Sequence, residues 1–267
     1  LTPWVLVPLV LVASGRTKGL ARAAALSALA VGLMGGVNAA VNFAAVLPAV
    51  LWFLTRRWDR TVAKLAGWWA LFVAMATLWW VVPLFLLGRY SPDFLDYIES
   101  AGDTTKVTNL IETVRGTSHW VGFLSNGLGS TWQIGGDLVT DSALIANTIV
   151  VAGAGLVGIV LLRITERLWV TSCLLLGVLM VTFGHLNAVE GWFAVSQHSA
   201  LDGALAPLRN VHKFDVLIRL SLSIGVVSVL SRLDIRKAWA QRNFSVVLWP
   251  AVIALAVIGV AAPALIG

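Results

Sequence analysis

The sequence predicts an all-α protein, a polytopic transmembrane helical bundle with about eight hydrophobic crossings. Hydrophobic residues make up 58% of the 267 positions and charged residues only 12%, whereas soluble domains keep about a quarter of their positions charged. The mean hydropathy is +0.87, and apolar stretches near the bilayer-spanning length of about 20 residues recur along the whole chain. Most of the surface is therefore expected to face lipid.

Polar connections divide the chain into apolar segments. Their approximate bounds are Leu1–Ala13, Ala23–Gly36, Val37–Leu54, Leu65–Leu87, Ala143–Leu162, Leu168–Leu186, Val216–Leu230 and Ser245–Ile266. The chain begins without Met and stops within an apolar run. We therefore expect residues 1–267 to be the transmembrane core of a longer chain.

Residues 23–54 must reverse direction, because Arg22 and Arg56 flank them on the same predicted side. Gly35-Gly36 is the natural turning point, since glycine tolerates the backbone angles of a tight reversal. Either two crossings or a re-entrant pair fits this stretch. Asn38 and Asn42 would share a helix face, where they would form interhelical hydrogen bonds or contact substrate.

Alternate connections are basic, and together they hold most of the 19 Lys and Arg. The residues are Arg16, Lys18, Arg22, Arg56, Arg57, Arg60, Lys64, Arg163, Arg167, Arg232, Arg236, Lys237 and Arg242. Positive charge is retained at the cytoplasmic face, so the sequence predicts a multi-pass plasma-membrane protein whose loops 88–142 and 187–215 lie outside. The net charge of +6 follows this distribution, which does not favour nucleic acid as a partner. The basic loops could also bind an acidic cytoplasmic protein or anionic lipid.

The strongest chemical pattern lies at the end of the second outer loop, where Arg209, His212 and Lys213 precede Arg219. A charged side chain at the centre of a membrane helix costs about 2.5–3.5 kcal/mol, so we expect Arg219 to bind a partner that offsets this cost. A lipid phosphate is one, because Arg binds it bidentately and Lys as a point charge. The alternative is that these side chains snorkel to ordinary headgroups.

The outer loops also carry carboxylates and indoles that suit a sugar. Asp93, Asp96 and Glu99 would share a helix face, where they could bind a sugar or serve as a base. Trp120, Trp132 and Trp192 could stack on sugar rings. A solvated helix face and anchoring at the membrane interface are the simpler alternatives. None of the four His has a second His at helical ligand spacing, so the sequence indicates no metal site or other cofactor, although it leaves a divalent metal open.

The run Gly153-Ala154-Gly155-Leu156-Val157-Gly158 matches the glycine pattern of dinucleotide-binding proteins. It lies inside a predicted crossing, without a preceding strand. We therefore interpret it as a site of close helix packing.

Four stretches of the chain form recognisable motifs. They are Gly35-Gly36-Val37-Asn38-Ala39-Ala40, Trp79-Trp80-Val81-Val82-Pro83-Leu84, Gly88-Arg89-Tyr90-Ser91-Pro92-Asp93-Phe94 and Leu208-Arg209-Asn210-Val211-His212-Lys213-Phe214-Asp215. Together they resemble the membrane core of the actinobacterial AftD-type α-(1→3)-arabinofuranosyltransferases, which are membrane glycosyltransferases of the GT-C class. The resemblance extends along the chain.

The resemblance implies transfer of arabinofuranose from decaprenyl-phosphoryl-arabinose to cell-wall arabinan on the outer face. Arg209, His212 and Lys213 would then hold the polyprenyl phosphate, with Arg219 below them. The acidic catalytic base is expected in the first outer loop of GT-C proteins, outside this chain, so the catalytic residues are unknown. A transporter or flippase for a lipid-linked glycan would use the same phosphate site. If the protein is instead a scaffold for other wall enzymes, removing these cations should change no lipid binding.

Overall fold

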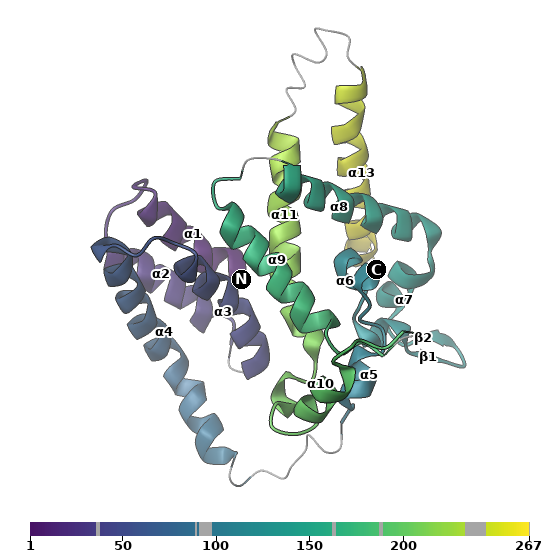
Figure 1. The fold of residues 1–267 in the computed structure, drawn as a ribbon, viewed down its shortest axis with the longest axis horizontal. Coiled ribbons are helices and arrows are strands. Elements are labelled where there is room, and N and C mark those ends of the chain that lie inside the picture. The colour runs from purple at the N-terminus through teal and green to yellow at the C-terminus, as the bar shows by residue number, and fades with distance from the viewer. Residues whose placement is uncertain are drawn as a thin grey trace. The chain divides into compact units, whose positions relative to one another are not determined.

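The computed structural model describes residues 1–35, 38–88, 90, 98–161, 164–186, 189–232 and 244–266. Within these ranges it confirms the all-α membrane fold, with an apolar helix for each predicted crossing (Figure 1). These helices are α1 (Thr2–Ala13), α2 (Leu20–Gly32), α3 (Ala39–Leu54), α4 (Arg60–Leu87), α8 (Ser142–Leu161), α9 (Arg167–Thr182), α11 (Asp215–Ser231) and α13 (Phe244–Ile266).

Three of the described helices are long and apolar enough to cross a membrane. They comprise α4, α8 and the stretch Val211–Ser231 that contains α11. Helices α1 and α2, with 12 and 13 residues, extend only about 18–20 Å, whereas the hydrocarbon core is about 30 Å thick. Apolar composition therefore located the helices correctly, while helix length distinguishes those that can span the membrane.

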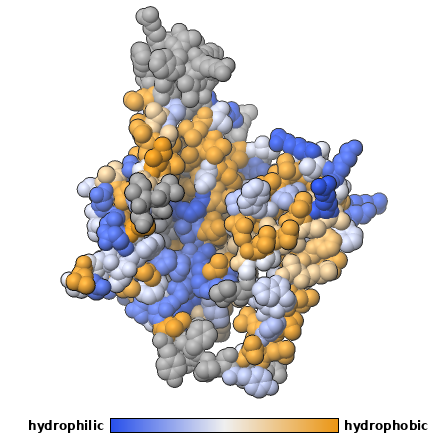
Figure 2. Space-filling view, turned by 180° about the vertical axis from the view of Figure 1, so that it is seen from behind, coloured by the Kyte–Doolittle hydropathy of each residue, from blue (hydrophilic) through white to orange (hydrophobic). Residues whose placement is uncertain are grey.

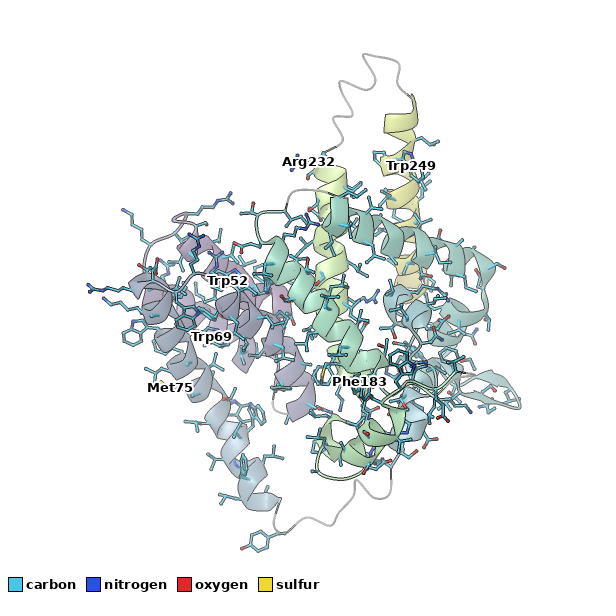
Figure 3. The ribbon with its side chains drawn as sticks, viewed as in Figure 1. Trp52, Trp69, Met75, Phe183, Arg232 and Trp249 are labelled. Carbon is cyan, nitrogen blue, oxygen red and sulfur yellow. The ribbon has the colours of Figure 1, made fainter. Side chains whose placement is uncertain are left out.

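The chain divides into two compact units, and the first comprises residues 1–99 with 206–208. In this unit α2 packs against α1 and α4, and two buried hydrogen bonds that share Ser27 join the three helices. The indole Nε1 of Trp69 in α4 donates to Ser27 Oγ in α2 at 2.9 Å, and that hydroxyl donates to the carbonyl of Val5 in α1 at 2.6 Å. Figure 3 labels Trp69 among the side chains of this unit. The indole, hydroxyl and carbonyl groups, which belong to buried residues, thus each have a hydrogen-bond partner.

The reversal between α2 and α3 uses the residues that the sequence predicted. Gly35 has a φ of +75°, a left-handed conformation that glycine adopts without strain, while Gly36 lies outside the described residues. Asn38 is the N-cap of α3 and accepts from Val41 N at 3.1 Å. The Asn42 amide donates to the Gly35 carbonyl. Both asparagines therefore stabilise this turn locally. The expectation that they share a helix face for interhelical hydrogen bonds was wrong, because Asn38 lies outside the helix as its cap.

The second unit comprises residues 100–205 and 209–267, and α11 packs in it against α8 and α9, with α13 also against α8. Close approach of α8 to α11 depends on glycine. A Cβ on Gly158 would lie 2.0 Å from the Gly225 carbonyl oxygen, and one on Gly225 would lie 2.0 Å from that of Gly155. The glycine run is therefore a helix-packing site, as small residues at membrane helix interfaces commonly are.

Short elements connect these helices in the second unit. They are α5 (Ala101–Thr105), α6 (Leu110–Arg115), η2 (Trp120–Phe123), β1 (Ser125–Asn126), β2 (Gly129–Ser130), α7 (Gln133–Thr140), α10 (Ala194–Leu201) and η4 (Val211–Phe214), while η3 (Ala206–Leu208) belongs to the first unit. Strands β1 and β2 pair antiparallel. Figure 2 shows apolar surface over the upper helices of the second unit and polar side chains below them.

Val107, Leu110, Ile111 and Val114 follow the i, i+3, i+4, i+7 spacing of a helix face, but the helix itself begins only at Leu110. Asn109 accepts from Glu112 N at 3.0 Å and so caps a new helix, α6, at Leu110. The capping asparagine therefore outweighs the apolar spacing before it. Leu110 and Ile111 are exposed, which suits contact with headgroups.

Candidate functional site

The two predicted outer loops fold against each other in the second unit. Thr104 Oγ1 of α5 donates to the Arg209 carbonyl at 2.9 Å. Thr105 Oγ1 lies 2.8 Å from His198 Nε2 of α10. Both threonines are buried, and each forms a hydrogen bond with a residue about 100 positions further along the chain. Residues of both loops are thereby held in one polar region beside the start of α11.

Imidazole and indole rings gather where η2 meets η4. The ring centroids of His119 and His212 are 3.9 Å apart, and those of His119 and Trp132 are 5.3 Å apart in an edge-on arrangement. Trp120 Nε1 donates to Asn210 Oδ1 at 3.1 Å. We call these five residues the His–Trp cluster. The His119–His212 ring contact and the Trp120–Asn210 hydrogen bond thus join residues from both outer loops.

The two imidazoles of the cluster differ in their hydrogen bonding. His119 Nδ1 accepts from Val121 N at 3.3 Å, and burial lowers the pKa of His119, so its ring is neutral at pH 7 with the proton on Nε2. His212 Nδ1 is buried and has no hydrogen-bond partner among the described residues. A buried polar atom without a partner is costly, so His212 suits a ligand that supplies one.

Arg209 is held inside the protein. Its Nε lies 3.1 Å from Asp202 Oδ1 and donates to the Leu201 carbonyl at 3.3 Å. Only 6% of its side chain is exposed, against 43% for Asp202. Arg209 therefore fixes the loop before η4 through Asp202 and Leu201.

Arg219 joins α11 to α6. Its Nε pairs with Asp215 at 3.0 Å, and its terminal nitrogens donate to the carbonyls of Val114, at 2.9 Å, and Thr113. These carbonyls lie in the last turn of α6, where a helix leaves acceptors without partners. A guanidinium has five N–H donors, and 34% of this side chain is exposed, so Arg219 can cap α6 and still approach a ligand.

The remaining predicted site residues are placed differently. Lys213 is half-buried in η4, next to His212. Trp192 is 97% exposed, whereas the indole N–H of Trp120 is used within the cluster. Asp93 and Asp96 lie outside the described residues. Only His212, Trp120 and Trp132 of the predicted site residues therefore belong to the His–Trp cluster.

Acidic side chains near this region already hold other groups. Asp202 pairs with Arg209 and Asp215 with Arg219, while Glu112 binds Arg115 at 2.9 Å. Within the described ranges, no three His, Cys, Asp or Glu side chains gather into a metal-ligand set. The polar region thus offers cations, imidazoles and indoles to a ligand.

Comparison with known proteins identifies the family. Residues 1–267 match the family model "Alpha-(1->3)-arabinofuranosyltransferase, N-terminal GT-C domain". The chain belongs to this AftD family. It is 41% identical over 247 residues to the alpha-(1->3)-arabinofuranosyltransferase of Mycobacterium tuberculosis and 40% identical over 235 residues to that of Mycolicibacterium smegmatis. These alignments cover 90% and 88% of this chain but 17% and 16% of the relatives, so the chain spans about a sixth of their length.

Solved structures agree with this family. The cryo-EM structure of arabinofuranosyltransferase AftD from mycobacteria matches 98% of this chain and 16% of its own, with a TM-score of 0.66 and 30% identity. A mutant form of AftD matches with a TM-score of 0.67 at the same identity and coverage. The AftD fold thus extends over almost all of this chain.

Sequence reasoning found the cationic residues of η4 and the outer indoles, Trp132 included, but did not single out His119 or Asn210 as site residues. Trp120 and Asn210 are about 90 positions apart in the chain, and so are His119 and His212. No local spacing could therefore indicate these contacts. Asn210 does lie within Leu208–Asp215, one of the stretches that carry the family resemblance. That resemblance was the sequence feature that could have indicated a role for Asn210.

Proposed function

We propose that this chain is the donor-binding part of a membrane glycosyltransferase that moves arabinofuranose from decaprenyl-phosphoryl-arabinose to cell-wall arabinan at the outer face of the plasma membrane. The observation that carries the proposal is the match of the whole chain to the GT-C domain of the AftD family. The names of the two mycobacterial relatives support arabinofuranosyl transfer.

In this proposal, η4 holds the donor phosphate. Lys213 supplies a compact positive charge, and the unpartnered Nδ1 of His212 supplies a hydrogen-bonding atom. Arg219 approaches from α11, while Arg209 positions the loop through Asp202. Exposed Trp192 is proposed to stack on an arabinan sugar ring. The proposal thus gives each predicted cation a separate role.

The chemistry requires charge stabilisation at this phosphate. An acceptor hydroxyl attacks the anomeric carbon of arabinofuranose, the bond from that carbon to the phosphate oxygen breaks, and the polyprenyl phosphate leaves with the electron pair. The hydroxyl proton passes to a base, which we expect in another loop of the full-length protein. A positive charge beside the departing phosphate lowers the barrier because negative charge develops there.

A transporter or flippase would bind the same donor phosphate without breaking a bond. The discriminating experiment reconstitutes the full-length protein in vesicles with labelled decaprenyl-phosphoryl-arabinose and an arabinan acceptor. We expect label to appear in the acceptor through a new glycosidic linkage. Movement of intact donor between leaflets, with no label in a competent acceptor, would replace the enzyme with transport.

A further inference from the structure

A groove runs between α1 and α2 in the first unit, and its lining residues come from these two helices and their connection. Its volume is about 900 Å³, and its walls include Trp4 and Leu11 of α1 and Leu26, Leu29 and Leu33 of α2. Trp4 is 64% exposed. An open apolar channel of this kind is unfavourable in water and suits a hydrocarbon chain.

The groove has the length of one membrane leaflet. Its lining on α2 runs from Arg22 to Leu33, a distance of about 16 Å at the helical rise. Half of the hydrocarbon core is about 15 Å. One acyl chain of a lipid in a single leaflet can therefore lie along the groove, whereas a lipid spanning both leaflets cannot.

One end of the groove is cationic. Thr17, Lys18 and Arg22 line it where α1 connects to α2, on the predicted cytoplasmic side. Lys18 and Arg22 are exposed, and the described residues include no ion pair for either. The first turn of α2 also lacks a side-chain cap, because its N-cap is Gly19. This end thus attracts negative charge at the depth of lipid headgroups.

We propose that this groove is a binding site for an anionic glycerophospholipid of the cytoplasmic leaflet. One acyl chain lies between α1 and α2, and the phosphate contacts Lys18 and Arg22. Charge and shape act together, since a zwitterionic lipid would place a further positive group near the same two cations. The site is independent of the donor site, because it uses neither η4 nor the outer loops.

Native mass spectrometry of the detergent-purified full-length protein tests the headgroup preference, with phosphatidylglycerol and phosphatidylcholine as probes. We expect phosphatidylglycerol to bind with an affinity about tenfold higher, a difference of about 1.4 kcal/mol. Lys18→Gln/Arg22→Gln should abolish that preference. The matched control is Arg57→Gln/Arg60→Gln, which removes two exposed cations from the next basic connection and should leave it intact.

Fluorescence quenching tests the position of the acyl chain. Phosphatidylglycerol brominated on its acyl chains should quench a component of the emission that is missing in Trp4→Phe. The double variant at Lys18 and Arg22 should need several-fold more of this lipid for half of that quenching.

Two results would overturn the proposal. Equal binding of the two lipids by the wild-type protein would remove the headgroup site. Absence of any Trp4-dependent quenching would mean that another segment of protein covers the groove.

Discussion

The variant Gly158→Ala tests the close packing of α8 against α11. A Cβ at this position would lie 2.0 Å from the Gly225 carbonyl oxygen, where contacts below 3.0 Å essentially never occur, so the helices must separate by about 1 Å. Overpacking costs about 1–3 kcal/mol, and the upper end applies because the obstructing atom is backbone. Subtracting about 1 kcal/mol for the better helix propensity of alanine leaves a net loss of about 2 kcal/mol.

The assay is thermal unfolding of the purified full-length protein, followed by fluorescence and by size-exclusion chromatography. Gly153→Ala is the matched control, since it lies in the same helix and a Cβ there meets nothing within 4 Å. We expect the unfolding temperature of Gly158→Ala to be several degrees below that of the wild type. The unfolding temperature of Gly153→Ala should equal or exceed that of the wild type. Equal unfolding temperatures for the two variants would refute the close approach of α8 to α11.

Three further predictions concern the described polar contacts. Arg209→Met should lower the free energy of unfolding by about 1–3 kcal/mol, because it removes the ion pair with Asp202 and the hydrogen bond to the Leu201 carbonyl. An unchanged denaturant midpoint would contradict this. Burial lowers the pKa of His119 below its ordinary 6.5, so the contribution of its neutral ring to stability is present above about pH 6.5 and is lost as the pH falls. His119→Gln should therefore flatten the decline in Tm between about pH 7 and pH 5. An unchanged decline would exclude His119 as a cause of the loss of stability. Trp69→Phe should cost about 1 kcal/mol by removing the donor to Ser27, and loss of that difference in a Ser27→Ala background would confirm the coupling by a double-mutant cycle.

The crossings were predictable because lipid imposes a strong rule on sequence. A helix in hydrocarbon must be apolar over a long stretch, and each predicted segment indeed contains a helix. Turns such as Gly35 also act through neighbouring residues, so their patterns are visible in the sequence. The glycine run was interpreted correctly because Gly155 and Gly158 share a helix face at the spacing of close packing.

The candidate site was only partly predictable, because charge alone does not show what a side chain contacts. Arg209 has the residue type that binds phosphate, yet its partner Asp202 precedes it on a folded loop. Arg219 likewise meets the end of α6, more than 100 positions earlier. The contact between His119 and His212 depends on the docking of two separate loops. Such tertiary contacts determine which cations remain available to a ligand.

The most direct test of the proposed donor site is the KM for decaprenyl-phosphoryl-arabinose in arabinose transfer by the full-length protein. Lys213→Gln is compared with Lys106→Gln, which neutralises an exposed lysine of the other predicted outer loop. We expect Lys213→Gln to raise this KM or lower kcat/KM at least tenfold, about 1.4 kcal/mol of lost stabilisation, with Lys106→Gln close to the wild type. An unchanged kcat/KM in Lys213→Gln would contradict donor binding at η4.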